Sequence, residues 1–325
     1  MSLQHRGIHR LGYVRLAVED LDAARRFALD TLGLIEYDAG PASPPAPEAR
    51  SSQERVYLRC WHEAHAYSYV LERGAPRLVE IGFGVRDTDD LAAATARIAT
   101  AGLTAEAAGA GEVLADLGPS LAVTVPAGPT LRLFTDQAVP GYVVGQKAPD
   151  WNTPRSLRGT PAPLFLTHVG VTTPDPETAI AFLTDVLGFG ISELLTTDDG
   201  ERTLSALLFR TNNGQDIAVY LGIDVRLHHV AFAKEDEVDI LRDATWLRQD
   251  GVQLDLYGPT RQSYGRTFSV HFHDPCGIRY ELCAGGRFSE LHPQFQPVRW
   301  TEANLGKALA FYDNVENKEF LTPSL

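Results

Sequence analysis

Cysteine is scarce in this sequence, which holds three among its 325 residues (Cys60, Cys276 and Cys283) and no Cys-x-x-Cys spacing. Three cysteines cannot all be paired and are too few for a disulfide framework, so the count favours a protein of a reducing compartment. The sequence also has no run of about 18 apolar residues. No apolar segment with a cleavage site stands near its start. We therefore expect a cytoplasmic protein without membrane contact.

Basic residues are also few, because 29 Lys and Arg stand against 42 Asp and Glu, giving a net charge of −13. No basic cluster overrides this balance, so a nucleic-acid partner is not expected. Neither a glycine-rich phosphate loop followed by Lys-Ser/Thr nor a Gly-x-Ser-x-Gly turn is present. A small neutral or apolar substrate fits better, and the length suits two domains.

The sequence contains one pattern written twice. Residues 13–34 (YVRLAVEDLDAARRFALDTLGL) and 168–189 (HVGVTTPDPETAIAFLTDVLGF) each read as a strand, an acidic helix start, a helix and Leu-Gly. In the second copy, Asp175 suits the N-cap, Pro176 the first helical position and Gly188 the C-cap. An apolar stripe at helical spacing lies between them.

The match continues to the end of each copy. RLVEIGF (77–83) resembles RLHHVAF (226–232), and a helical segment follows each. A hairpin at 121–134 then resembles one at 268–283. Each half thus reads strand, helix and strand, then a helix or loop, then three strands. This pattern predicts a duplicated α+β protein.

Composition places the expected boundaries. We expect an N-terminal domain at 1–137, a Pro- and Gly-rich linker at 138–160, a C-terminal domain at 161–287 and a packing tail at 288–325. Within these, residues 39–50 read as an exposed loop and residues 304–312 as a short helix.

The alternation of side chains along a strand predicts different orientations for the adjacent residues His228 and His229. Side chains alternate between the two faces of a strand, so only one of the pair is expected to face a site. We place His228 against the helices and His229 on the concave face. By the same alternation, Glu281 faces away from the apolar side of its strand, and His168 begins the first strand of the second copy. His168, His229 and Glu281 can therefore converge.

Two imidazoles and one carboxylate suit a divalent metal with open coordination positions, such as Fe(II), with Mn(II) as the alternative. Each residue alone is more simply a hydrogen-bonded polar side chain, but three on matched strands favour a metal. The equivalent positions in the first copy are Tyr13, Glu80 and Arg132. Arginine offers no acceptor, so we expect that half to bind no metal and to hold a Glu80–Arg132 ion pair.

Several motifs together resemble one superfamily. They are THVGV (167–171), RLHHVAF (226–232), GPTR (258–261), HDPCGIRYE (273–281) and RWTEANLGKALAFY (299–312). The chain resembles the vicinal oxygen chelate superfamily, and within it the two-domain extradiol ring-cleaving dioxygenases of the catechol 2,3-dioxygenase type.

The resemblance implies two tandem domains of paired βαβββ modules, each forming a curved, barrel-like mixed sheet. It implies Fe(II) on His168, His229 and Glu281, with a catechol chelating the metal through its vicinal oxygens while O₂ cleaves the ring. A role in aromatic hydrocarbon catabolism and a homo-oligomer, dimer or tetramer, are also implied.

Positions around the implied metal depart from the family pattern. Gln215 and Gln262 stand where the family has histidines, and His271 stands where it has a tyrosine. Glutamine can hydrogen-bond a substrate oxygen but cannot move protons. If residues 271 and 281 pair across the hairpin, His271 lies beside the metal, either as a proton donor or only as a support for Glu281. Tyr264 is a second potential donor, whereas His273 is expected to be exposed.

Two other functions remain compatible with these residues. One is a different metal-dependent enzyme on the same scaffold, such as an isomerase, for which His271 could serve as base. The other is a non-catalytic protein that binds a hydrophobic small molecule. The complete set of three metal-binding residues weighs against the latter, and the absent family histidines weigh for it.

Overall fold

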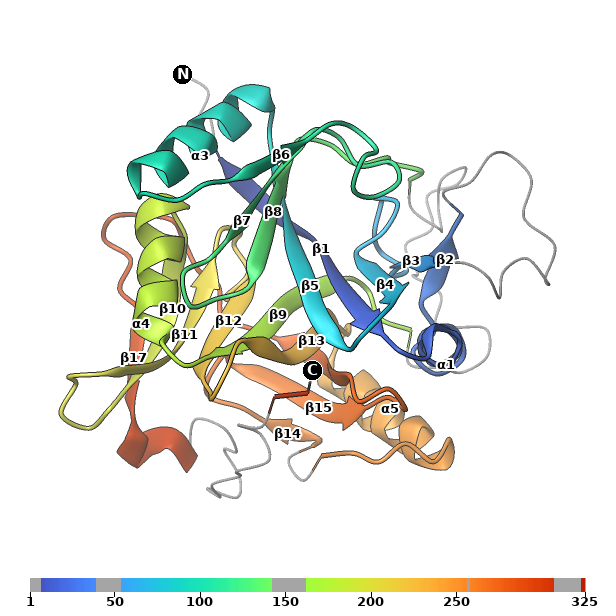
Figure 1. Cartoon of the computed structure of the whole chain (residues 1–325). Helices are drawn as coiled ribbons and strands as arrows, with labels where there is room; N and C mark the ends of the chain where they lie inside the picture. The colour runs from blue at the N-terminus through green and yellow to red at the C-terminus, as the bar shows by residue number, and fades with distance from the viewer. Residues whose placement is uncertain (1–6, 39–53, 142–161, 256–257, 307–322, 325) are drawn as a thin grey trace.

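A computed structural model describes residues 7–38, 54–141, 162–255, 258–306 and 323–324. The described chain forms two mixed sheets, one from residues 8–134 and one from residues 166–301, with few helices (Figure 1). We call these parts the N-terminal and C-terminal halves. The predicted α+β class with two tandem units is confirmed.

The N-terminal half contains two βαβββ modules in an eight-stranded sheet of order β2-β3-β4-β1-β5-β8-β7-β6. Its helical elements are α1 (Leu21–Arg26), continued by the π-helical turn η1 (Phe27–Thr31), and α3 (Thr88–Thr100). Its strands are β1 (Ile8–Val18), β2 (Ile35–Tyr37), β3 (Arg55–Arg59), β4 (Tyr69–Arg73), β5 (Arg77–Val85), β6 (Glu106–Ala108), β7 (Ser120–Thr124) and β8 (Thr130–Phe134).

The C-terminal half repeats the arrangement in a nine-stranded sheet of order β14-β15-β16-β13-β9-β12-β11-β10-β17. Its helical elements are α4 (Pro176–Ala181), continued by η2 (Phe182–Val186), then α5 (Glu237–Gln249) and η3 (Glu302–Asn304). Its strands are β9 (Leu166–Thr173), β10 (Gly190–Thr196), β11 (Thr203–Phe209), β12 (Ile217–Leu221), β13 (Arg226–Ala233), β14 (Thr260–Arg261), β15 (Thr267–His273), β16 (Arg279–Gly285) and β17 (Val298–Thr301).

The helical segment formed by α4 and η2 begins and ends where its sequence predicts. The Asp175 side chain accepts a hydrogen bond from the Thr178 N–H, and Pro176 occupies the first helical position. Gly188 has a φ of +75°, the left-handed conformation that ends the helix. The π-helical turn η2, which periodicity does not predict, fills the interval between α4 and Gly188.

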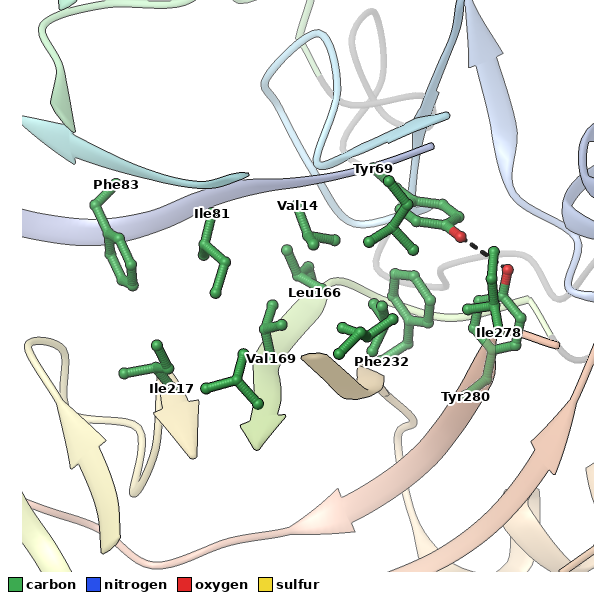
Figure 2. Close-up of a cluster of buried hydrophobic side chains, with 14 of the residues drawn as sticks. Val14, Tyr69, Ile81, Phe83, Leu166, Val169, Ile217, Phe232, Ile278 and Tyr280 are labelled. Atoms are coloured by element: carbon green, nitrogen blue, oxygen red, sulfur yellow. Dashed lines mark hydrogen bonds between the residues drawn. The ribbon is translucent and has the colours of Figure 1, made fainter. Parts of the chain in front are cut away.

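One apolar core joins the two halves (Figure 2). Val14, Tyr69 and Phe83 of the N-terminal half belong to the same buried cluster as Phe232 and Tyr280 of the C-terminal half. The hydroxyl groups of Tyr69 and Tyr280 lie 2.8 Å apart and are hydrogen-bonded. The largest apolar cluster of the described residues is therefore shared by the two halves.

The tail predicted at 288–325 adds a strand to the C-terminal sheet, because β17 pairs with β10 in parallel. The exposed loop expected at 39–50 lies outside the described residues, as do most of the linker at 138–160 and most of the helix expected at 304–312. Among the residues that the structure describes, no helix is both long enough and apolar enough to cross a membrane.

Candidate metal centre

Three polar side chains meet on one face of the C-terminal sheet. His168 lies on β9, His229 on β13 and Glu281 on β16, and each is at most 2% exposed. The two Nε2 atoms are 3.0 Å apart. The nearer Glu281 oxygen lies 3.1 Å from His168 Nε2 and 3.2 Å from His229 Nε2. The structure thus brings together the three residues that the sequence selects as metal ligands.

Strand pairing explains this convergence. Ala231 is the register partner of both His168 and Glu281, while His229 pairs with Gly170. A Cβ atom at position 170 would lie 2.5 Å from Cε1 of the His229 ring. Glycine at position 170 therefore leaves the space that the imidazole occupies.

The adjacent histidines depart from strict alternation. The β9–β13 register shifts between Leu227 and His229, so His228 is the extra residue of a bulge. Its Nδ1 lies 2.6 Å from His229 Nδ1, and its ring packs on Tyr220 at 4.7 Å between centroids. The prediction that His228 faces the helices is wrong, because the bulge turns both rings toward the same side.

Burial sets the charge of the imidazole and the carboxylate. Desolvation lowers the pKa of His229 to about 4, so its ring is neutral at pH 7. Desolvation alone would raise the pKa of Glu281, but the imidazoles of His271, His168 and His229 outweigh it and hold that pKa well below its usual range. A neutral imidazole and a carboxylate are the forms in which these groups bind metals.

A second hydrogen bond fixes the tautomer that we assign to His168. Its Nδ1 lies 2.7 Å from Thr167 Oγ1, and that hydroxyl donates to the Ala231 carbonyl at 3.3 Å. The hydroxyl proton is therefore used, so His168 Nδ1–H donates to Thr167. In this tautomer the lone pair of His168 Nε2 is available for a metal.

This donor set fits a divalent cation. Ligand atoms that bind at about 2.1 Å on one face of an octahedron lie about 3.0 Å from one another. The separations of 3.0, 3.1 and 3.2 Å between the atoms of His168, His229 and Glu281 match that spacing. Two nitrogens and one oxygen on a single face leave further positions open, as in the facial triad.

His271 belongs to the same cluster. It is the register partner of Glu281, which confirms the predicted hairpin pairing. Its Nε2 lies 3.7 Å from the Glu281 carboxylate, and burial lowers its pKa below the ordinary value. His273 lies nearer the turn, with a side chain 38% exposed and 3.3 Å from Asp255.

The two glutamines are also buried. Gln215 borders a small cavity together with His168 and Thr267. Backbone pairing of Gln262 with Thr267 places the Gln262 side chain on the same face as Ser269 and His271. Gln215 Oε1 and Gln262 Nε2 have no hydrogen-bond partner among the described residues, so both amides have capacity for a ligand.

Sequence reasoning did not find the apolar group beside these side chains. Tyr220 contacts the His229 ring at 6.3 Å between centroids, and Tyr264 donates or accepts a 2.8 Å hydrogen bond with Ser205. Burial raises the pKa of the Tyr264 phenol. The alternation of side chains between the two faces of strands 203–209 and 217–221 is the sequence signal that could have revealed this apolar group. We call it the apolar wall: Leu195, Leu204, Leu207, Ala218, Tyr220, Tyr264, Trp300 and Leu305.

The equivalent point of the N-terminal half holds charges in place of ligands. Glu80 accepts hydrogen bonds from Tyr13 at 2.8 Å and from Arg132 Nε at 2.9 Å, and Arg15 lies 3.5 Å from the same carboxylate. The predicted Glu80–Arg132 ion pair is confirmed. Donors surround one carboxylate here, which is the reverse of a metal site.

Comparison with known proteins adds sequence relatives. Residues 165–282 match the model of the Glyoxalase/Bleomycin resistance protein/Dioxygenase superfamily. The chain is 32% identical over 318 residues to metapyrocatechase of Pseudomonas sp. (strain CF600), covering 98% of both chains. It is 25% identical over 310 residues to the manganese-dependent 2,3-dihydroxybiphenyl 1,2-dioxygenase of Geobacillus genomosp. 3, covering 94% of both.

A solved structure also resembles the whole chain. The crystal structure of the 2,3-dioxygenase LapB from Pseudomonas sp. KL28 superposes with a TM-score of 0.81 at 27% sequence identity. The match covers 92% of this chain and 99% of LapB, so both halves and their mutual arrangement are shared.

Proposed function

Because the chain belongs to the Glyoxalase/Bleomycin resistance protein/Dioxygenase superfamily, and within it to the two-domain extradiol ring-cleaving dioxygenases, we propose that His168, His229 and Glu281 hold Fe(II) for the cleavage of a catechol by O₂. The observation that carries this proposal is the 3.0–3.2 Å triangle of two imidazole nitrogens and one carboxylate oxygen. Mn(II) suits the same ligands and is the alternative metal.

The bound metal supplies a chelation point for the two vicinal oxygens of the catechol and a neighbouring position for O₂. The protein supplies a buried, preorganised surround. His168 is fixed in one tautomer by Thr167, and His229 is held by its 2.6 Å contact with His228. These contacts would hold both imidazoles in the orientation that binding a metal requires.

We propose His271 as the residue that handles protons. Its place opposite Glu281, 3.7 Å from the carboxylate, puts an imidazole within reach of a bound catechol oxygen. Tyr264 is the second candidate donor, although its hydroxyl is already bonded to Ser205. Gln215 and Gln262 bind substrate oxygens through amide groups and move no protons.

The apolar wall supports a neutral aromatic substrate. Tyr220 and Leu207 offer aromatic and aliphatic surface on the face that carries His229. Glu193 and Arg287, the charged pair beside the wall, are bonded to each other at 2.9 Å. Because the two charges neutralise each other, this pair does not favour a charged ring substituent. We therefore propose catechol or an apolar-substituted catechol as substrate.

Anaerobic loading with Fe(II), followed by catechol and then O₂, tests the function. We expect stoichiometric oxygen uptake, a yellow ring-opened product and slower turnover of a carboxylated catechol. E281Q should lose metal affinity by at least about 100-fold, because even outer partners of metal ligands contribute 10- to 100-fold. Background oxygen uptake by the metal-loaded protein across a panel of catechols would refute the proposal.

A variant at His271 separates its two roles. H271Q keeps a polar side chain but cannot exchange a proton, so kcat should fall by about 10²- to 10⁴-fold while metal content is retained. Metal loss in H271Q would instead assign His271 to the support of Glu281.

We also propose a cytoplasmic homo-oligomer, a dimer or tetramer. Three unpaired thiols favour the reducing compartment, and Ile223 and Phe288 expose large apolar side chains at 87% and 64%. Light scattering on the purified protein tests the assembly state.

A further inference from the structure

The C-terminal half buries a carboxylate for which the proposed reaction has no use. Glu193 on β10 is 0% exposed. Its Oε1 accepts hydrogen bonds from the Gly265 backbone N–H and from Arg287 Nε, both at 2.9 Å. Its Oε2 accepts one from Trp300 Nε1 at 2.7 Å. One side chain thus joins the turn after β14, the segment after β16 and strand β17.

Cross-strand pairing places Glu193 on the metal-binding face. Its register partner is Leu207, and the row continues through Ala218 and Gly170 to His229. Side chains of one cross-strand row point to the same face of a sheet. Glu193 therefore stands in the same row as the proposed ligand His229, and the residues next to His229 in that row are small.

Two of the donors to Glu193 carry the outer part of the apolar wall. Trp300 packs against the cluster that contains Tyr220 and Tyr264. Gly265 directly follows Tyr264 and has a φ of +78°, which directs its N–H toward the carboxylate without a Cβ penalty. A change at Glu193 therefore reaches Tyr264 and Trp300 together.

We propose that Glu193 is a positioning residue that fixes Trp300 and the Tyr264–Gly265 turn as one wall of the substrate pocket. The inference rests on the function proposed above, because the wall matters to a catechol only if a catechol binds beside it. A carboxylate suits this position because each oxygen only accepts hydrogen bonds. An amide would present N–H groups to at least one of the three donors.

The variants E193Q and W300F test this role. E193Q keeps the size of the side chain, but the amide N–H group of glutamine would face at least one of the N–H donors that now bond to Glu193. The resulting displacement of the apolar wall should raise the KM for catechol about tenfold. The kcat should change by less than about threefold, and the iron content should stay the same, because Glu193 touches neither metal ligand nor reacting atom. The double variant E193Q/W300F should have a KM no higher than E193Q, since phenylalanine removes one opposing donor.

E80Q is the matched control. Glu80 is also buried, with hydrogen bonds from Tyr13 and Arg132 and with Arg15 at 3.5 Å, but it lies in the N-terminal half. E80Q should lower Tm while the KM stays within about twofold of the wild-type value. A lowered Tm in E193Q with a wild-type KM would assign Glu193 a merely structural role and overturn the inference.

Indole fluorescence gives a readout that does not depend on turnover. The Trp300 contribution to the emission is the wild-type spectrum minus that of W300F, and in the variant it is the E193Q spectrum minus that of E193Q/W300F. In E193Q this contribution should shift in wavelength, and acrylamide should quench it more strongly. An unchanged Trp300 contribution would overturn the inference. Absence of ring cleavage in the wild type would refute the proposed function instead, and the quenching result would still decide on Glu193.

Discussion

At the scale of single residues, burial creates a titratable group away from the metal centre. Asp274, in the turn after β15, accepts hydrogen bonds from the N–H groups of Cys276 and Ile278, each at 2.8 Å. Desolvation nonetheless raises its pKa from 3.8 to about 6. The folded protein therefore binds this proton more tightly than the unfolded chain does.

This shift predicts a pH dependence of stability. The Asp274 contribution should fall as pH rises from about 4 to about 6 and stay constant above, a total of roughly 3 kcal/mol for two pKa units. D274N keeps one acceptor oxygen for Cys276 and Ile278 but cannot ionise. Urea unfolding at several pH values should therefore show the wild type losing stability relative to D274N over that interval. Parallel curves for the two proteins would contradict the assignment.

At the scale of elements, Gly170 on β9 leaves the space in which the ring of His229, a proposed ligand on β13, lies. A Cβ at Gly170 would lie 2.5 Å from the His229 ring, and a Cβ at Gly82 would lie 2.2 Å from the Tyr13 ring. Both glycines therefore make room for one ring on the neighbouring strand. Of the two rings, only that of His229 belongs to the proposed metal centre.

The glycines provide a matched pair of variants. G170A should displace His229 and weaken metal binding by about 10- to 100-fold. G82A should destabilise the fold by about 1–3 kcal/mol through overpacking and leave metal affinity unchanged. Calorimetric titration with metal and thermal unfolding measure the two effects. Equal metal affinities in G170A and the wild type would show that the ring tolerates the methyl group.

Strand periodicity explains how much of this site the sequence predicts. The convergence of His168, His229 and Glu281 follows from period-two alternation, and the Glu80–Arg132 pair follows from the duplication. The orientation of His228 does not, because a bulge interrupts the alternation without a local sequence signal. The contacts of Glu193 also escape prediction, since its donors lie up to 107 residues away along the chain.

At the scale of the whole molecule, the two halves depend on each other. The segment before β9 is held by the N-terminal half, through backbone bonds from Trp61 to Pro163 at 3.1 Å and from His62 to Leu164 at 2.8 Å. Glu63 accepts the Leu166 N–H at 2.9 Å, two residues before His168. The N-terminal half thus anchors the strand that carries His168, the first of the proposed ligands.

The shared core predicts a single unfolding transition. F232A removes a fully buried ring that meets Tyr69 across the junction, so the free energy of unfolding should fall by about 3–5 kcal/mol. Hydrogen exchange followed by mass spectrometry should show β4 and β12 losing protection together. Wild-type protection of β4 in F232A would show that the halves unfold separately.

Arg15, which faces Glu80, bears on whether the N-terminal half could acquire a metal centre of its own. Arg15 occupies, in the N-terminal half, the register position that Gly170 occupies beside His229. Replacing Tyr13, Glu80 and Arg132 by metal ligands would therefore not suffice, because an imidazole at position 80 would collide with Arg15. Removing Arg15 would in turn leave Glu72 without its 2.9 Å hydrogen bond from Arg15. A second metal centre in the N-terminal half would therefore need changes at four positions, and each of the four side chains now contributes to a buried hydrogen bond or ion pair.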